Sequence, residues 1–194
     1  MRTDNCVVDD RRLVKLSKYL ARHLRHDPAR LGLVLQPGGW VDVDDLLHAC
    51  ATRGMAMSRA ELDEVVERND KKRYSFDAVG TRIRANQGHS AAVDLQLQPA
   101  EPPAELFHGT AAASVDAIMR SGLLPMSRHH VHLSLDTETA RRVGARHGKP
   151  IVLRVDAAAA AASGSVFFVS DNGVWLVDEV PPAFLTVVGE ECPR

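Results

Sequence analysis

The side chains best suited to chemistry stand in short basic signatures. Arg22 and His23 are adjacent in the first amphipathic segment, Arg73 ends the run NDKKR, and Arg146 stands within GARHG. A guanidinium offers a fixed fork of donors to two phosphate oxygens and stays charged at any working pH. Histidine can donate or accept a proton near neutrality. Spacing alone leaves a plainer interpretation open, with the arginines as solvated surface charges and His23 as a hydrogen-bonded boundary residue.

The histidines of the second half do not predict a metal site. On a strand His130 and His132 would share a face, but no carboxylate or cysteine stands beside them in the sequence. Zinc sites combine three or more ligands at tetrahedral spacing. The GxGxxG, P-loop, HExxH and GxSxG signatures do not occur either. We therefore expect no metal and no Rossmann-type nucleotide site.

The composition favours a soluble globular protein. The chain has 194 residues, a formal net charge of -1 and 45% hydrophobic residues. No run of 18 apolar residues is available to span a bilayer, and the acidic N-terminus does not match a secretory signal. Cys6, Cys50 and Cys192 are odd in number and far apart, which argues against a disulfide framework. We expect a cytoplasmic, monomeric protein that does not associate with a membrane.

The near-neutral charge hides an asymmetry along the chain. Residues 1–90 contain 16 Lys and Arg against 13 Asp and Glu, whereas residues 91–194 contain 8 against 12. The excess is strongest in residues 1–30, where eight basic residues face four acids. A local positive face can therefore exist on a protein that is not basic overall.

The first 90 residues are predicted to form three helices and a hairpin. Leucines at steps of three and four residues indicate an amphipathic helix over 10–26 with a basic outer face. A second helix is expected over 42–53, and a third begins at Ser58 with a capping box to Glu61. Residues 73–85 alternate apolar and polar side chains, as in a hairpin. This order predicts a winged-helix-like module.

The pattern changes after a segment that resembles a linker. Residues 91–104 contain three prolines and two glutamines without periodicity. Beyond them short apolar runs alternate with turn signals, and helical patterns cover 111–121 and 137–144. The runs predicted as strands are 106–107, 131–135, 151–155, 166–169 and 174–177. The fold class is therefore α+β, with one lobe over 1–90 and a second over 105–194.

Eight short segments, in order along the chain, carry a family resemblance. They are Leu16–His26, Gly39–Val41, Asn69–Tyr74, Ile83–Ser90, Leu106–Thr110, His130–Ser134, Val143–Gly148 and Asn172–Leu176. Together they resemble the RNA 2′-phosphotransferase family, NAD-dependent enzymes that in fungi remove the splice-junction 2′-phosphate from tRNA. A single segment would be a weak signal, but eight in order are a strong one.

The resemblance implies an N-terminal winged-helix RNA-binding lobe and a C-terminal ADP-ribosyltransferase-like lobe that binds NAD. It implies that the RNA 2′-phosphate attacks the nicotinamide-bearing ribose carbon, giving an ADP-ribosylated RNA phosphate. The ribose 2″-hydroxyl then attacks that phosphate, which yields 2′-OH RNA and ADP-ribose 1″,2″-cyclic phosphate. No metal is needed.

The resemblance also implies which residues form the site. The catalytic residues would be Arg22, His23, Arg73 and Arg146, with His23 acting either as a proton donor or as a group that orients the phosphate. The residues at NAD would be His108, Gly109, Thr110, His132 and Ser134. Without the resemblance, His108-Gly-Thr110 would be read as a turn at the end of a strand.

Two other functions stay open from the sequence. One is an ADP-ribosyltransferase that caps terminal phosphates of RNA or DNA and stops after the first step. The other is a winged-helix DNA-binding regulator whose second domain senses NAD or ADP-ribose. The complete catalytic set favours the phosphotransferase, because a pure sensor would not need Arg73 and Arg146 together.

Overall fold

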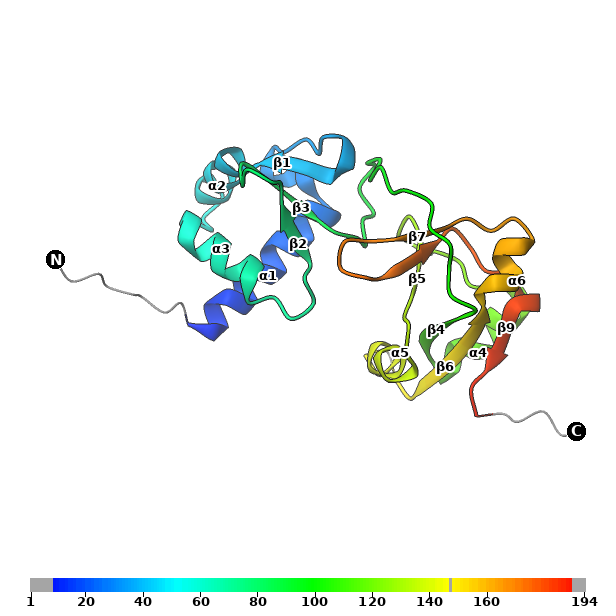
Figure 1. Cartoon of the computed structure of the whole chain (residues 1–194). Coiled ribbons are helices and arrows are strands. Elements are labelled where there is room, and N and C mark those ends of the chain that lie inside the picture. Colours follow the sequence, from blue (N-terminus) through cyan, green and yellow to red (C-terminus); the bar gives the residue numbers. More distant parts are fainter. Residues whose placement is uncertain (1–8, 147, 190–194) are drawn as a thin grey trace, which may run out of the picture. The chain divides into compact units, whose positions relative to one another are not determined.

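The computed structural model describes residues 9–146 and 148–189 (Figure 1). The chain divides into two compact units, Met1–Gln96 and Leu97–Arg194, here called unit 1 and unit 2. Both units contain helices and antiparallel strand pairs, which agrees with the α+β class. No helix among the described residues is long and apolar enough to cross a membrane.

The described part of unit 1, residues 9–96, contains three α-helices and one three-stranded antiparallel sheet. The helices are α1 (Asp10–Arg25), α2 (Val43–Thr52) and α3 (Arg59–Glu67), and a short 3-10 turn, η1 (Pro28–Leu31), follows α1. The strands are β1 (Trp40–Asp42), β2 (Tyr74–Phe76) and β3 (Arg82–Ala85), in the order β1-β3-β2. The predicted helices and hairpin are confirmed. The strand β1 was missed, because its three residues are stabilised only by pairing with β3, about 40 residues further along the chain.

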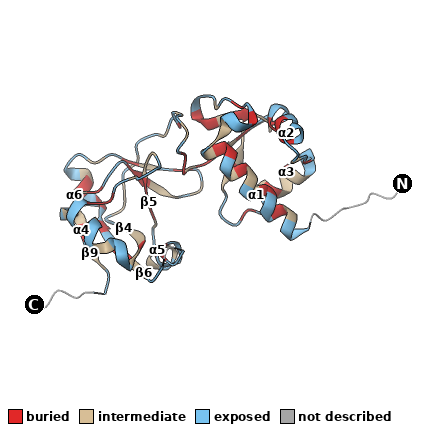
Figure 2. Ribbon diagram, turned by 180° about the vertical axis from the view of Figure 1, so that it is seen from behind, coloured by how far each residue is buried: buried red, intermediate tan, exposed pale blue. Residues whose placement is uncertain are grey.

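The leucine stripe of α1 is buried along one side of the helix (Figure 2). Leu16, Leu20 and Leu24 are fully buried in the core of unit 1. His23, expected at the flank of this stripe, is only 3% exposed. Its side chain is therefore part of the packed interior as well as a candidate functional group.

Among the three cysteines, Cys50 lies within the described residues. It is a free thiol on α2, buried in the core of unit 1. Burial raises the pKa of Cys50 to about 11, so it stays a neutral thiol at physiological pH. The predictions concerning Cys6 and Cys192 fall outside the described residues.

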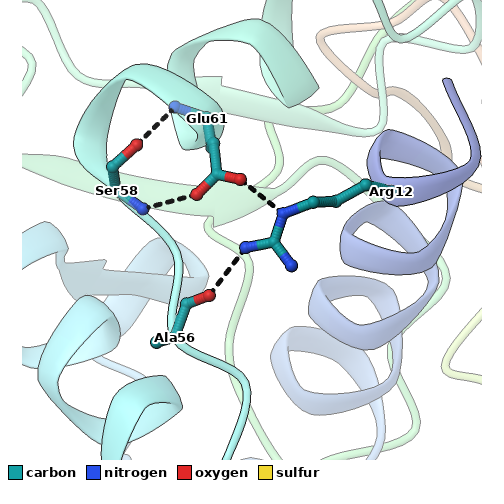
Figure 3. A network of polar contacts seen from close by, with 4 residues as sticks. All are labelled: Arg12, Ala56, Ser58 and Glu61. Carbon is teal, nitrogen blue, oxygen red and sulfur yellow. Dashed lines mark hydrogen bonds and ion pairs between the residues drawn. The ribbon is translucent and has the colours of Figure 1, made fainter. Parts of the chain in front are cut away.

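The capping box predicted for α3 is present and also connects α3 to α1 (Figure 3). Ser58 Oγ accepts from the Glu61 backbone N–H at 3.2 Å, and Glu61 Oε2 accepts from the Ser58 N–H at 2.8 Å. The second oxygen of Glu61 accepts from Arg12 Nε at 2.5 Å, and Arg12 Nη2 donates to the carbonyl of Ala56 at 2.9 Å. One carboxylate therefore caps α3 and pairs with α1.

This arrangement predicts an acid-sensitive contribution to the stability of unit 1. The hydrogen bond from Arg12 is the main reason why the pKa of Glu61 is lowered. A lowered folded-state pKa stabilises the protein fully above the unfolded pKa of Glu, about 4.3, and this stabilisation is lost as pH falls through the folded pKa. Urea unfolding from pH 7 to pH 3 should show Glu61→Gln below the wild type at pH 7, with the gap closing in acid. Glu67→Gln, an exposed position on the same helix, should leave the curve unchanged; a gap that stays constant across this range would contradict the prediction.

Among its described residues, unit 2 contains two three-stranded antiparallel sheets. One has the order β4 (Glu105–Ala111), β6 (Pro150–Asp156), β9 (Leu185–Val187); the other has the order β5 (Val131–Leu133), β8 (Trp175–Val177), β7 (Phe167–Val169). The helices are α4 (Val115–Ser121), α5 (Thr137–Gly144) and α6 (Ala157–Ala162). Each apolar run predicted as a strand overlaps one. The helix expected over 111–121 begins only at Val115, because β4 continues to Ala111 and a 3-10 turn follows it.

Helix α5 packs unusually closely on β4. A Cβ atom on Gly109 of β4 would lie 1.6 Å from the carbonyl oxygen of Ala140 in α5. A Cβ on Gly144 would lie 2.8 Å from the carbonyl oxygen of Thr110. The backbones of the helix and the strand can approach this far only because both positions lack a side chain.

Candidate functional site

A large cavity in unit 1, of about 990 Å³, is lined by α1, by α3, by residues 69–71 and by Arg73. Its wall is rich in basic side chains. Two of the acidic side chains in the wall are paired with Arg68, which contacts Glu64 at 2.7 Å and also Asp10. The remaining basic side chains in the wall are Lys18, Arg22, Lys71 and Arg73, with His26 beside them and Asp70 as the remaining acid. The cavity therefore has an excess of positive charge suited to an anion.

Arg73 is held in this wall by a buried asparagine. Asn69, 8% exposed, accepts a hydrogen bond from Arg73 Nη1 at 3.1 Å and donates from Nδ2 to Ser17 Oγ of α1 at 3.0 Å. The backbone on the other side is fixed by Asn86, whose N–H donates to the Arg73 carbonyl at 2.9 Å. Asn86 Nδ2 also donates to the carbonyl of Lys72 at 2.8 Å. The guanidinium of Arg73 is thus preorganised by Asn69, which Ser17 of α1 holds in turn, while Asn86 fixes the backbone of Arg73.

Arg22 and His23 are neighbours in α1 but differ in environment. Arg22 is exposed and lines the large cavity. It also lines a small cavity of about 270 Å³, whose wall includes His23. His23 Nδ1 lies 3.0 Å from the carbonyl oxygen of Asp27, and since a carbonyl can only accept, Nδ1 carries a proton. His23 therefore has Nε2 to offer a ligand.

In unit 2 the structure brings His108, His132 and Ser134 together where β4 meets β5. Phe107 and Ser134 exchange backbone hydrogen bonds of 2.9 and 2.8 Å. His108 Nδ1 donates to the carbonyl of His132 at 3.1 Å, and the His132 ring contacts Arg128 at 3.4 Å.

Burial lowers the pKa of His108, and the hydrogen bond to His132 opposes this only in part. His108 is therefore neutral at physiological pH. Because its Nδ1 carries the proton, its Nε2 is a hydrogen-bond acceptor for a ligand hydroxyl or amide.

Gly109 and Thr110 belong to the neighbouring contact between β4 and α5, and Arg146 lies just beyond the end of α5. The side of Gly109 on which a Cβ would stand faces α5. In this structure the close backbone approach that glycine permits is therefore made to a helix. Arg146 follows Gly144, the helix residue in contact with Thr110, by two positions and is exposed. The five residues predicted for NAD therefore gather in one region of unit 2. Helix α5 packs on this region and ends at Gly144, two residues before Arg146.

The predicted catalytic set is divided between the two units. Arg22, His23 and Arg73 belong to unit 1, and Arg146 belongs to unit 2. Within unit 1, Arg22 and Arg73 share the large cavity, whereas His23 lines the small one. Within the described ranges, no three His, Cys, Asp or Glu side chains gather as a metal site would require.

Sequence reasoning missed the residues that support the arginines. Asn69 was visible as the first residue of the NDKKR run, and asparagine favours turns because its side chain bonds the backbone two residues on, as it does here with Lys71. Ser17, by contrast, gives no signal, because its contact with Asn69 spans 52 positions. Lys18 and Lys71 join the cavity wall for the same reason, through folding of distant segments onto α1.

Comparison with known proteins identifies the family of this chain. The profile described as "RNA 2'-phosphotransferase, Tpt1 / KptA family" matches residues 11–179. The chain belongs to this family. It is 62% identical to a "Probable RNA 2'-phosphotransferase" of Trichormus variabilis over 178 residues, which cover 92% of this chain and 98% of the relative. A protein of the same name from Streptomyces griseus is 61% identical over 189 residues, covering 94% and 100% of the two chains, and one from Hahella chejuensis is 48% identical over 179 residues, covering 92% and 96%.

Proposed function

We propose that this member of the RNA 2′-phosphotransferase family removes an internal 2′-phosphate from RNA by transferring it to NAD. The observation that carries the proposal is the positively charged large cavity, in which a buried network aims Arg73 at the same space as Arg22. The RNA would bind through unit 1, as a winged-helix-like lobe, and NAD through unit 2, as an ADP-ribosyltransferase-like lobe. No metal ion takes part.

The arginines supply what a phosphate nucleophile needs. A 2′-phosphate already carries its negative charge, so its attack requires positioning rather than a general base. Arg22 and Arg73 would each bind two phosphate oxygens in a fixed geometry. In the second step charge grows on the oxygens of the attacked phosphorus, and Arg146 would join them in stabilising the transition state.

The residues of unit 2 fit the chemistry of a bound NAD. When bound, NAD supplies the ribose carbon that accepts the phosphate, with nicotinamide as the leaving group. His108 presents a neutral ring nitrogen as an acceptor, while Thr110 and Ser134 add hydroxyl groups. With His132 and the backbone of Gly109, they would orient the ribose and the amide.

His23 would act through Nε2, since Nδ1 is occupied by the carbonyl of Asp27. In its protonated form, Nε2 can donate to a phosphate oxygen or give its proton to the departing RNA 2′-oxygen. The fixed Nδ1 contact holds the ring at one orientation in α1, which is what a positioned proton donor requires.

A direct assay tests the proposal. The protein is incubated with NAD and an oligoribonucleotide that carries one internal 2′-phosphate, and the formation of 2′-OH RNA and nicotinamide is followed. The expected result is equimolar appearance of both. Absence of turnover by folded protein would overturn the proposal. A stable ADP-ribosylated terminal phosphate would support the capping function instead, and sequence-specific duplex binding without NAD consumption would support the regulator.

Asn69 gives a prediction about positioning. Asn69→Ala removes the acceptor of Arg73 Nη1 and the link to Ser17. We expect kcat/KM to fall roughly tenfold, the equivalent of one charge-assisted hydrogen bond. Because Asn69 would act through Arg73, the double variant Asn69→Ala/Arg73→Ala should be no slower than Arg73→Ala alone. Additive losses would show that Asn69 acts by another route. Glu67→Ala, at an exposed position outside the large cavity, serves as the control.

A further inference from the structure

The small cavity in unit 1 is surrounded by positive charge. Three arginines from three different elements line it: Arg22 on α1, Arg30 on η1 and Arg53 at the C-terminus of α2. The other lining residues are Tyr19, His23 and Leu31. No Asp or Glu among the described residues stands in this wall.

The three guanidinium groups lack the partners that other arginines of unit 1 have. Arg12, Arg59, Arg68 and Arg82 each form an ion pair with a carboxylate. In residues 9–146 and 148–189, no hydrogen bond or ion pair engages the side chains of Arg22, Arg30 or Arg53.

Two of these charges act on the same point in the wall. Burial raises the pKa of the Tyr19 hydroxyl, and the positive charges of Arg53 and Arg30 oppose that rise. Both guanidinium groups therefore lie within electrostatic range of this hydroxyl. Like charges that converge without a carboxylate repel one another, and an anionic ligand would relieve the repulsion.

The small cavity is large enough to hold a phosphate group. Its volume of about 270 Å³ corresponds to roughly nine water molecules at the density of the liquid. Arg22 lines both the small and the large cavity. Two anions bound in these cavities would therefore be separated by a single arginine side chain, so a ligand that occupies both must carry two phosphates close together.

An internal 2′-phosphate in RNA provides that pair. The 2′-phosphate and the phosphodiester on its 3′ side are attached to adjacent carbons of one ribose. We propose that Arg30 and Arg53 bind this 3′ phosphodiester in the small cavity while Arg22 and Arg73 hold the 2′-phosphate in the large one. The inference rests on the proposed function and extends it, since it makes Arg30 and Arg53 the residues that select an internal 2′-phosphate.

The test measures RNA binding by the full chain without NAD, so that it does not depend on turnover. Each probe is an oligoribonucleotide with one internal 2′-phosphate, in which the 3′ linkage, the 5′ linkage or neither is a neutral methylphosphonate. The variant is Arg30→Gln/Arg53→Gln. Its matched control is Arg11→Gln/Lys15→Gln, which removes the same charge from exposed positions of α1 outside both cavities.

The expected result is that the effect of the neutral 3′ linkage on affinity depends on the presence of Arg30 and Arg53. The wild type and the control should lose affinity roughly tenfold to a hundredfold when the 3′ linkage is neutral, as for one or two charge-assisted contacts. The Arg30→Gln/Arg53→Gln variant should bind the unmodified probe and the probe with the neutral 3′ linkage equally well, because the two arginine charges that would pair with that linkage are absent. Equal losses in all three proteins, or coupling to the 5′ linkage instead, would overturn the proposal.

The test separates this inference from the proposed function. Coupling without NAD-dependent turnover would leave the phosphodiester site intact and reject the phosphotransferase. Turnover without coupling would do the reverse. Circular dichroism of the variants confirms that the exposed substitutions leave the fold unchanged.

Discussion

Replacing Arg73 with alanine is expected to slow removal of the 2′-phosphate by about tenfold to a thousandfold, the range for loss of one preorganised transition-state donor. The effect is expected to be large because Asn69 and Asn86 already hold the arginine and its backbone in place, so little reorganisation accompanies the reaction. The measurement is single-turnover kinetics with saturating NAD, which isolates the chemical steps.

Two further variants make this prediction specific. Arg73→Lys keeps the charge but loses the two-pronged geometry, so its rate should lie between those of the wild type and Arg73→Ala. Arg11→Ala removes an exposed charge of α1 outside the large cavity and should have no such effect. If Arg73→Ala and Arg146→Ala both react at the wild-type rate, the assignment of the catalytic arginines is wrong.

Gly109→Ala is expected to destabilise unit 2 by about 3 kcal/mol or more, at the upper end of overpacking effects. The new Cβ would lie 1.6 Å from the Ala140 carbonyl oxygen and 2.5 Å from its carbon, and both belong to helix backbone that cannot rotate away. Helix α5 must therefore shift, and Arg146 follows the end of that helix. We expect a lower unfolding midpoint in urea and loss of NAD-dependent turnover.

Gly144→Ala tests the same close packing, because the direction of its effect on stability should be the reverse of that in an exposed helix. In an exposed helix this exchange stabilises by roughly 0.5–1 kcal/mol, because alanine is the better helix former. Here the added methyl would meet the backbone of Thr110 at 2.8 Å, so the change should destabilise. A neutral or stabilising Gly144→Ala would contradict the close packing of α5 on β4.

The elements of this protein follow from local patterns in its sequence. Three patterns depend on neighbours within a few residues: the leucine stripe of α1, the Ser58–Glu61 capping box, and the alternation within β2 and β3. Such patterns can be read without knowledge of the fold. The family was recognisable for a related reason, because its short segments and their order can be read directly from the sequence.

The roles of the residues within those elements were decided by tertiary structure. The sequence placed His23 at the flank of a helix and Gly109 beside a cofactor, but packing buries the first and presses the second against α5. Arg22 shares the large cavity with Arg73 and His23 does not, and this division depends on how residues 69–73 fold onto α1.

Taken alone, the sequence determined the family, the order of the elements and which arginines and histidines are available for phosphate chemistry. Only the folded chain decided that Asn69 and Ser17 would brace Arg73, and that Arg30 and Arg53 would meet Arg22 around a second cavity. These contacts join residues far apart in the chain. They form when apolar burial brings whole elements together, and no local spacing records which polar side chains then become neighbours.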